Sequence, residues 1–467
     1  MSLAPSLVVL LRVDRAADRH TDHPRHLHPA LDLKYIQAGL ESALGSAVPL
    51  LDGWLAPFEP EIFAARALAH APRIAVVRAV TWCLEESLAV ARILRRAGVT
   101  TIAVGQQVDH LMRMDRAAGD EAYDYCVAGE PEEAVPRLVA RLLAGEDPAG
   151  FREAGFTHLV RDPDALPRPV PTAEELAAYP FPFPLRCRPL SRWAYVLTAW
   201  GCPRPCRHCT AIVRKSVGRD LRPRDIAAVV DEVLALRDAG AQAISFEDDS
   251  LFVHRARFLE LADALVRRDA KLPWMANARP DELDGERVAA AAAAGAVLVK
   301  VGVDTGSPRM IEHLGKSADG AGWIRATEAG MARLNHYGVG SVALFMVGMP
   351  DETPDDAQAT LALARRIRPD YLQMQQYRAY PDVPMWAELP EQARAQAGDY
   401  HYLAPAANCS RIPAAQLPLL QRRLYRRFYL RPDFVARHLV RHWRHYLSPR
   451  GAAVVPAALR YLLRADA

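Results

Sequence analysis

Short apolar runs alternate with amphipathic stretches over the first third of the chain. Residues 7–11 form an apolar run typical of a buried strand, and Leu33, Ile36 and Leu40 recur at the spacing of one helix face. The same alternation predicts strands at 48–51, 74–80, 100–104 and 125–127, and helices at 31–44, 59–71, 84–97 and 132–143. This interleaving predicts an α/β fold with a parallel, doubly wound sheet, whose ligand crevice lies at the carboxyl ends of the strands.

The alternation resumes after residue 192 with a longer period. The pattern predicts strands at 194–198, 243–246, 273–276, 297–303, 341–347 and 371–375, with helices at 226–239, 256–267, 285–294, 324–337 and 355–367. Six parallel βα units predict a partial (β/α)6 barrel of the TIM type. The active site of such a barrel lies at the C-terminal ends of its strands.

Two further regions complete the predicted organisation. Residues 147–191 are rich in proline, which fixes the backbone and removes a hydrogen-bond donor, so an extended linker is expected there. The last residues combine aromatic side chains with arginines at helical spacing and predict a small helical domain. We therefore divide the chain into 1–146, a linker at 147–191, a barrel at 192–400 and a helical domain at 401–467.

Composition and charge limit the possible functions. The chain has 467 residues, 51% of them hydrophobic, and a formal charge of +3, which is too mild to imply a nucleic-acid partner. Basic residues concentrate locally, because residues 421–450 contain nine arginines and one acid, Asp433. The apolar run 288–299 has twelve residues, fewer than the roughly 20 needed to span a bilayer, and residues 7–11 lack the flanks of a signal peptide. We expect a cytoplasmic protein.

Three of the seven cysteines share one loop. Cys202, Cys206 and Cys209 are spaced C-x3-C-x2-C among glycine and prolines, so three thiolates can turn toward one inorganic centre. Closed zinc and iron–sulfur sites use four protein ligands, so three cysteines leave one metal position open to a small molecule. A structural zinc site with His208 as fourth ligand is disfavoured, because adjacent residues rarely bind one ion.

The other cysteines are scattered along the sequence. A disulfide framework is disfavoured because the cysteines are sparse and odd in number. The four cysteines outside the loop are expected to be small core residues, namely Cys83, Cys126, Cys187 and Cys409. The sequence leaves open whether one of them contacts the cluster in the folded protein.

The cysteine loop resembles that of the radical S-adenosylmethionine (SAM) superfamily. The resemblance implies a 4Fe–4S cluster on the three cysteines, whose open iron binds the amino and carboxylate groups of SAM. It also implies a role for residues that follow the predicted strands. Glu247 and Asp248 are expected near the methionyl amino group, Arg279 as a basic contact, Asp304 at the ribose, Gly348 close to the adenine and His208 stacked beside it. Three residues depart from the family pattern: Trp200 stands where relatives often have arginine, His208 where they often have an aromatic residue, and Asp304 where they usually have glutamate, which is one methylene longer. A solvated loop or a helix N-cap remains the alternative for the two acids.

The first region resembles the cobalamin-binding, Rossmann-like domain of one branch of that superfamily. Residues 29–36 and 129–132 carry this resemblance, as do 377–381 after the last strand. Two departures stand out: His23 replaces the glycine of the D-x-H-x-x-G loop, and Gln106 replaces a second glycine. Residues 428–432 resemble the C-terminal domain of members that modify hopanoids, tetrapyrroles and other secondary metabolites.

Three functions follow from these patterns. The first is a cobalamin-dependent radical SAM methyltransferase that acts on an unactivated carbon of a small biosynthetic intermediate. The second is a radical SAM enzyme with an empty N-terminal domain that catalyses oxidation, cyclisation or rearrangement, and the third is a non-catalytic iron–sulfur protein. An electron donor such as flavodoxin or ferredoxin is implied. The basic C-terminal helices are expected to form a small core or to meet an anionic ligand or membrane surface. No residue is assigned to substrate acid–base chemistry.

Overall fold

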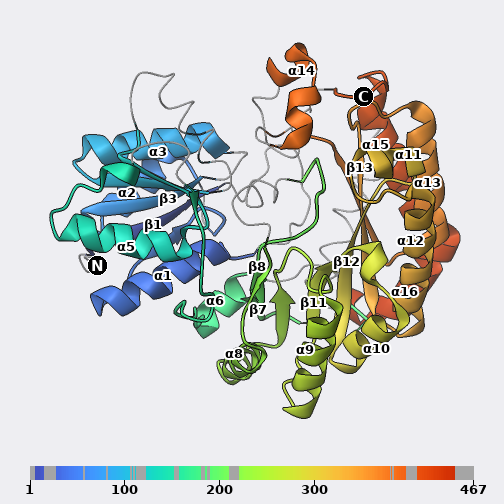
Figure 1. Cartoon of the computed structure of the whole chain (residues 1–467), viewed down its shortest axis with the longest axis horizontal. Coiled ribbons are helices and arrows are strands. Elements are labelled where there is room, and N and C mark those ends of the chain that lie inside the picture. The colour runs from blue at the N-terminus through green and yellow to red at the C-terminus, as the bar shows by residue number, and fades with distance from the viewer. Residues whose placement is uncertain are drawn as a thin grey trace.

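The structure is a computed structural model of the whole chain (Figure 1). It describes all residues except 1–5, 15–27, 56–57, 80–82, 106–107, 109–110, 112–121, 152–156, 180–184, 187–189, 210–219, 379, 381–382, 396–407 and 448–467. Several residues discussed above therefore lie outside the described part of the chain, namely His20, His23, Gln106 and Cys187.

The first half of the chain forms a six-stranded parallel sheet in the order β2-β1-β3-β4-β5-β6. Residues of β1 (Val8–Val13) alternate between its two faces, because Val8 and Leu10 pack under α1 and α5 whereas Val9 and Leu11 pack under α2 and α3. This confirms the doubly wound sheet. The other elements are α1 (Leu31–Leu44), β2 (Leu50–Asp52), α2 (Pro60–Leu68), β3 (Ile74–Ala79), α3 (Leu84–Arg96), β4 (Thr100–Val104), β5 (Tyr125–Gly129), α5 (Pro131–Leu143) and β6 (Thr157–His158).

The proline-rich region contains secondary structure of its own. Its residues Thr157–His158 add the edge strand β6 to the N-terminal sheet, and α6 (Ala173–Ala178) is a short helix within it. The helix begins at a capping box in which Thr172 and Glu175 satisfy each other's backbone N–H groups. The expectation of an extended linker is therefore corrected for these two stretches.

The second sheet is a partial barrel of six parallel strands in the order β14-β13-β12-β11-β10-β7, as predicted. Outward-facing residues such as Val299 and Val301 pack against the surrounding helices in the largest core of the protein. The strands are β7 (Trp193–Val196), β10 (Ala243–Phe246), β11 (Trp274–Ala278), β12 (Ala296–Asp304), β13 (Gly340–Val347) and β14 (Tyr371–Gln376). The helices are α8 (Ile226–Asp238), α9 (Arg255–Arg267), α10 (Gly285–Ala293), α11 (Pro308–His313), α12 (Gly320–His336) and α13 (Pro354–Ile367).

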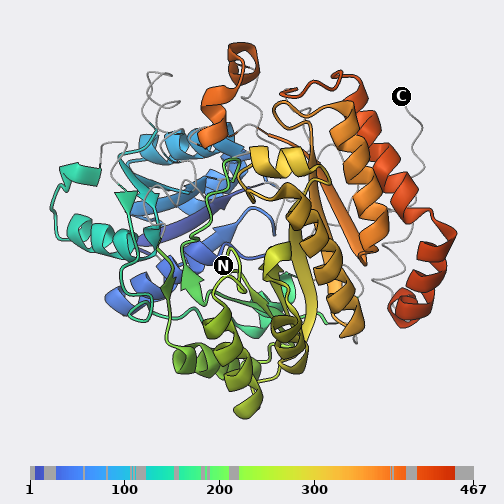
Figure 2. The same cartoon turned by 45° about the vertical axis from the view of Figure 1, so that its right-hand side comes forward.

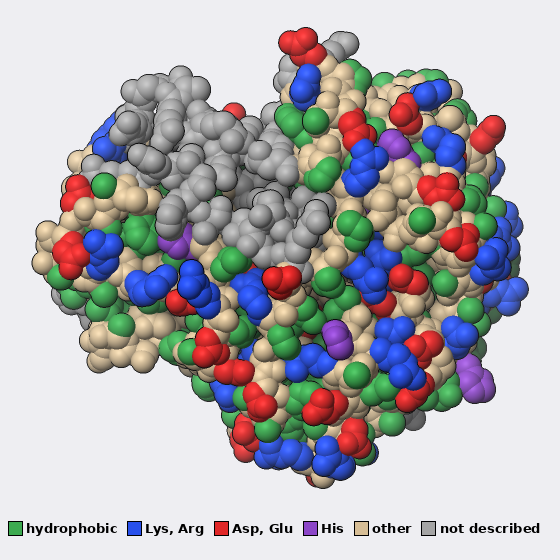
Figure 3. All heavy atoms as spheres, in the orientation of Figure 1, with side chains coloured by type: hydrophobic (Ala, Val, Ile, Leu, Met, Phe, Trp, Pro, Cys, Tyr) green, Lys and Arg blue, Asp and Glu red, His purple; other side chains and the backbone are tan. Residues whose placement is uncertain are grey.

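Two C-terminal helices continue the outer layer of the barrel. Figure 2 shows α15 (Gln416–Tyr429) running beside α13, with α16 (Pro432–Tyr446) below it. Among the described residues, no helix combines the length and the apolar character that crossing a membrane requires. Figure 3 shows acidic and basic side chains interspersed over the barrel face, in keeping with the small net charge.

Helix α15 protects the open edge of the barrel. The strand β14 has a neighbour on one side only, which leaves backbone groups unpaired on the other. The Tyr429 hydroxyl accepts from the Leu372 N–H at 2.8 Å and donates to the Leu372 carbonyl at 2.9 Å. The Tyr425 hydroxyl does the same for Met374, at 2.9 and 3.2 Å. Two phenols thus replace the hydrogen bonds of a seventh strand.

We predict that the double change Tyr425→Phe and Tyr429→Phe lowers stability. The Tyr429 change leaves the Leu372 N–H and carbonyl without a partner. The Tyr425 change leaves only the Met374 N–H without one, because the Gln421 side chain still donates to the Met374 carbonyl at 2.7 Å. The cost is about 1–3 kcal/mol per site. The thermal unfolding midpoint and the hydrogen exchange of the Leu372 and Met374 amides measure this effect. Tyr337→Phe is the matched control, because Tyr337 is 43% exposed. Unchanged exchange at both amides would contradict the role given to the phenols.

Candidate functional site

The cysteine loop begins where β8 (Ala199–Trp200) ends. Gly201 has φ of 89°, which a residue with a side chain rarely adopts, and it turns the chain into the loop. Cys202 and Cys206 are buried and Cys209 is partly exposed. All three cysteines lie beyond the C-terminal end of the first barrel strand, as the sequence predicts for an active-site loop.

The segment that follows α11 holds this loop in place. The Arg207 N–H donates to the Leu314 carbonyl at 3.0 Å, and the Arg207 guanidinium donates to the His313 carbonyl at 3.0 Å. Gly315 has φ of 65°, and a Cβ there would lie 3.3 Å from the Pro205 carbonyl oxygen. The loop is therefore packed backbone against backbone on the α11 segment.

Arg279 lies against the cysteine loop. Its guanidinium donates toward the Cys206 sulfur at 3.5 Å, makes two 3.0 Å hydrogen bonds with Asp281 and stacks over Trp323 at 4.6 Å. Burial alone would lower the pKa of Arg279, but its bonds and attraction to Asp281 and the nearby Cys206 raise that pKa above its ordinary value. A fixed positive charge at a ligand sulfur is a means of tuning a cluster's potential.

Asp304 ends β12 and forms a second charged group beside the loop. The carboxylate pairs with the Lys316 ammonium at 2.6 Å and lies 3.7 Å from the His208 ring. Burial would raise the pKa of Asp304, but Lys316 and His208 outweigh it and hold that pKa below its ordinary value. Lys316 is kept charged in turn, because Asp304 and Cys206 raise its pKa despite burial. The structure thus brings His208 and Asp304 together, as the proposed adenosine site requires.

Sequence analysis missed two residues of this site. Lys316 follows α11 and ends no strand, so no strand-end signal marks it. Glu282 is fully buried and accepts from Arg204 of the cysteine loop at 2.8 Å and from the Arg279 N–H at 3.1 Å. It also accepts from the Ser250 hydroxyl. Because a lone glutamate after a strand has many structural uses, its role emerges only from these contacts.

The two acids after β10 differ in their surroundings. Asp248 accepts from the Thr198 N–H at 2.7 Å and from its hydroxyl at 2.5 Å, and burial raises the pKa of Asp248 to about 6. Its carboxylate thus fastens the end of β10 to the end of β7. Glu247 is partly exposed and accepts from the Ser245 hydroxyl. Of the predicted pair, Glu247 is the one whose carboxylate is available to a ligand.

Gly348 lies in a tight turn at the end of β13. Its φ is 85°, and a Cβ would lie 3.3 Å from the Leu417 side chain of α15. One Glu352 carboxyl oxygen accepts from the Gly348 N–H at 2.5 Å and from the Met349 N–H at 3.0 Å. Burial raises the pKa of Glu352 to about 7, although both N–H groups act to lower it. A carboxyl that titrates near neutral pH therefore shapes the backbone that is predicted to approach the adenine.

The carboxyl ends of the N-terminal strands meet the barrel region. Arg12 of β1 lies 3.3 Å from Asp52 of β2, and Asp52 accepts from the Tyr179 hydroxyl at 2.7 Å. The His28 ring lies 6.4 Å from Tyr195 of β7. Burial, followed by the charge of Arg12, lowers the pKa of His28 to about 3, so this residue is neutral.

Two more contacts join the N-terminal sheet to the cysteine-loop region. Glu130 after β5 pairs with Arg222 of β9 (Arg222–Pro223) through two hydrogen bonds of 2.6 Å. Trp200, immediately before the loop, packs edge-on against Tyr35 of α1 at 5.4 Å. The tryptophan at this departure from the family pattern thus serves the contact between the two sheets.

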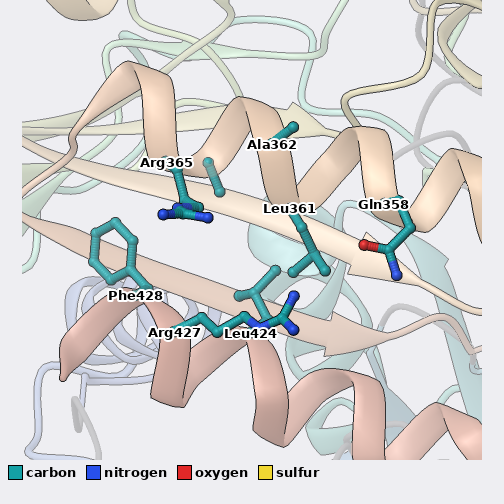
Figure 4. A pocket seen from close by; sticks show the side chains of 8 residues that line it. Gln358, Leu361, Ala362, Arg365, Leu424, Arg427 and Phe428 are labelled. Atoms are coloured by element: carbon teal, nitrogen blue, oxygen red, sulfur yellow. The ribbon is translucent and has the colours of Figure 1, made fainter. Parts of the chain in front are cut away.

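The pocket in Figure 4 lies elsewhere. It is formed by side chains of α13 and α15, including Leu361, Arg365 and Phe428, on the outer side of the barrel. It encloses about 130 Å³, below the roughly 300–1,000 Å³ of typical small-molecule sites. We therefore place the functional site at the cysteine loop and the strand ends.

The raised pKa of Glu352 predicts a pH-dependent stability. Because the folded protein binds this proton more tightly than the unfolded chain, stability falls as the pH rises from about 4.5 to about 7. Glu352→Gln keeps an oxygen for the Gly348 and Met349 N–H groups without titrating. As the pH rises from 5.5 to 8, we expect the unfolding free energy of the variant, relative to that of wild type, to increase by roughly 2 kcal/mol.

Unfolding midpoints at both pH values, with Glu146→Gln at an exposed carboxyl as control, measure the difference. Parallel pH profiles for wild type and Glu352→Gln would contradict the raised pKa.

Comparison with known proteins supports the radical SAM resemblance. Residues 197–364 match the family model described as the Radical SAM superfamily. An uncharacterized methyltransferase of Pyrococcus horikoshii is 24% identical over 73% of each chain. The anaerobic magnesium-protoporphyrin IX monomethyl ester cyclase of Rubrivivax gelatinosus is 25% identical over 51% of this chain and 42% of its own length.

The fold is also similar to a solved structure over most of its length. The radical SAM methyltransferase TsrM from Kitasatospora setae, a structure with cobalamin and a [4Fe-4S] cluster bound, gives a TM-score of 0.65 at 20% identity. The match covers 83% of this chain and 78% of TsrM, so it spans both parallel sheets and confirms the predicted α/β architecture. The family match places residues 197–364, which contain the cysteine loop and the barrel strands β10 to β13, in the radical SAM superfamily.

Proposed function

We propose that this protein is a cobalamin-dependent radical SAM methyltransferase that acts on an unactivated carbon of a small biosynthetic intermediate. The observation that carries the proposal is the fold match to TsrM, which includes the N-terminal sheet as well as the barrel. The Pyrococcus relative is also described as a methyltransferase. Fold similarity alone leaves the substrate open, because sites vary widely on one fold.

The cysteine loop fits a cluster that lacks a fourth protein ligand. Two of its three cysteines are buried, and Arg279 supplies a compensating positive charge at Cys206. Among the described residues, no three His, Cys, Asp or Glu side chains lie close enough to hold a single metal ion. Each cysteine of a 4Fe–4S cluster binds a different iron, so the loop has to accept several metal atoms rather than one.

The residues around the loop suit SAM. When bound and reduced, the cluster and SAM supply a 5′-deoxyadenosyl radical, and methylcobalamin supplies a methyl group. Asp304, held charged by Lys316, is placed to accept hydrogen bonds from ribose hydroxyls, and His208 lies beside it. Glu247 offers an acceptor to the methionyl amino group, and the Gly348 turn brings backbone to the adenine. The packed barrel wall limits the access of water to the reacting atoms.

Features of the N-terminal sheet support the proposal that it binds cobalamin. Its strands end beside the barrel, where Asp52 bonds Tyr179 and His28 approaches Tyr195. Gly105, after β4, has φ of 142°, and a Cβ there would lie 2.3 Å from the Ala79 carbonyl oxygen. The carboxyl edge is therefore built from close backbone contacts at this point, and ligands of doubly wound sheets bind at this edge.

A second function remains the alternative. The Rubrivivax relative is described as a cyclase, and that description favours an oxidation or cyclisation over methyl transfer. The two readings differ in whether cobalamin is bound and in the products formed from SAM.

Partners and location form part of the proposal. One-electron reduction of the cluster calls for a donor such as flavodoxin or ferredoxin, and a reducing cytoplasm suits the cluster. We propose an anionic partner for the C-terminal helices, because residues 421–450 contain nine arginines and one acid. Apolar residues of α16, including Val440 and Trp443, are exposed as well.

The cluster assignment predicts the result of removing its ligands. The triple change to alanine at Cys202, Cys206 and Cys209 should abolish iron and sulfide binding, because no other ligand set is proposed. Iron and sulfide analysis after anaerobic reconstitution measures this. The matched control replaces Cys83, Cys126 and Cys409, and it should retain the full cluster. Full cluster content in the first variant would overturn the assignment.

Cobalamin content and product analysis test the function. Anaerobically reconstituted protein should bind about one cobalamin per chain. Once a substrate is supplied, each turnover should yield both 5′-deoxyadenosine and S-adenosylhomocysteine, because one SAM gives the radical and another restores the methyl group. Protein that holds no cobalamin and yields deoxyadenosine alone would establish the second function instead.

A further inference from the structure

The inner face of β12 carries a lysine at the floor of the barrel. Val299 and Val301 point outward into the helical layer, so Leu298, Lys300 and Gly302 face the interior. Leu298 belongs to an apolar layer that closes the bottom of the barrel together with Tyr195 and Met275. Lys300 is the next inward residue above that layer.

Polar residues of the neighbouring strands lie at the same level as Lys300. Lys300 pairs in register with Asn277 of β11. Phe246 pairs with Ala276, which brings Glu247 next to Asn277 on the following strand. The floor of the barrel thus presents a carboxylate, an amide and an ammonium group in one row across three strands. Farther round, Gln373 and Gln375 of β14 are exposed, because Leu372 and Met374 take the outward positions.

Lys300 differs from the other cationic side chains nearby because it has no acidic partner among the described residues. Its ammonium makes no hydrogen bond or ion pair with any residue in the described ranges, whereas Lys316 binds Asp304. Only five of the 58 Lys and Arg residues are lysines. Two of these five, Lys300 and Lys316, belong to the barrel. The neighbouring His28 is neutral, so it provides no charge to pair with the Lys300 ammonium. A partly buried, unpaired ammonium is costly, and an anionic ligand removes that cost.

We propose that Lys300 binds an anionic group of the substrate, such as a carboxylate, phosphate or phosphonate. The adjacent inward residue, Gly302, has no side chain to cover Lys300, and the Lys316 Nζ lies 3.6 Å from where a Cβ of Gly302 would be. Lysine suits this task because its ammonium is a compact point charge that does not impose the planar geometry of arginine. Asn277 and Gln373 supply further hydrogen-bonding groups. This inference rests on the proposed function, since it assumes that the barrel interior is the substrate site.

The anion has two possible sources, the substrate and the methionyl carboxylate of SAM. Lys316 lies beside the cysteine loop, with Cys206 contributing to its raised pKa, whereas Lys300 lies one inward position below Gly302. The position of Lys300 therefore favours the substrate.

Methylphosphonate serves as the probe, because its binding can be followed by phosphorus NMR without a known substrate. Reconstituted holoenzyme with SAM present is titrated, and SAM affinity is measured separately by equilibrium dialysis. We expect Lys300→Met to weaken methylphosphonate binding at least tenfold and to leave SAM affinity within twofold of wild type. Lys300→Arg should restore most of the binding. Lys271→Met is the matched control at an exposed lysine.

Each other outcome counts against the proposal. Loss of SAM affinity in Lys300→Met would assign this lysine to the cofactor carboxylate. Equal methylphosphonate binding in wild type and Lys300→Met, or no binding to wild type, would refute an anion site. Failure of the proposed function is distinguishable, because it would appear as wild-type protein that binds methylphosphonate but holds no cobalamin and yields deoxyadenosine without S-adenosylhomocysteine.

Discussion

An incomplete barrel has two open edges, and the rest of this structure depends on how they are covered. At β14 the hydroxyl groups of Tyr425 and Tyr429 take the place of a seventh strand. After β7 the Arg224 guanidinium and backbone N–H donate to the Leu197 and Thr198 carbonyls at 2.9 and 3.0 Å. Side chains of the residues that follow the barrel strands thus satisfy backbone groups that a neighbouring strand would otherwise pair with.

Buried charges organise the mouth of the barrel. Four charged side chains at the barrel mouth are largely buried, namely Arg279, Lys316, Asp304 and Glu282. Each of them pairs with an oppositely charged side chain or makes several hydrogen bonds. Removing one partner from such a set leaves an uncompensated charge, so these residues act as a unit. The Lys316 carbonyl also accepts from Arg279 at 2.7 Å, which couples the position of the ribose acid to the guanidinium at Cys206. Binding at one part of this network is therefore expected to affect the other.

Hydrophobic periodicity was sufficient to predict both parallel sheets, because each strand of a doubly wound sheet or barrel is buried on two faces. It also located the site at the strand ends. It could not predict which way each strand-end acid points, and so it treated Glu247 and Asp248 alike although Asp248 fastens two strands together. Lys316 and Glu282 were missed for a related reason: their partners are distant in sequence, and only the folded chain brings them to Asp304 and Arg204.

The departures from the family pattern follow from the same geometry. Trp200 takes a position where an arginine is common, and its ring packs on Tyr35 of the N-terminal sheet. His208 lies between the last two cysteines and approaches Asp304, which is one methylene shorter than the usual glutamate. The shorter acid is held by Lys316, so the ammonium compensates for reach by fixing the carboxylate in position. At both positions a contact within this chain holds the substituted side chain, made by Tyr35 for Trp200 and by Lys316 for Asp304.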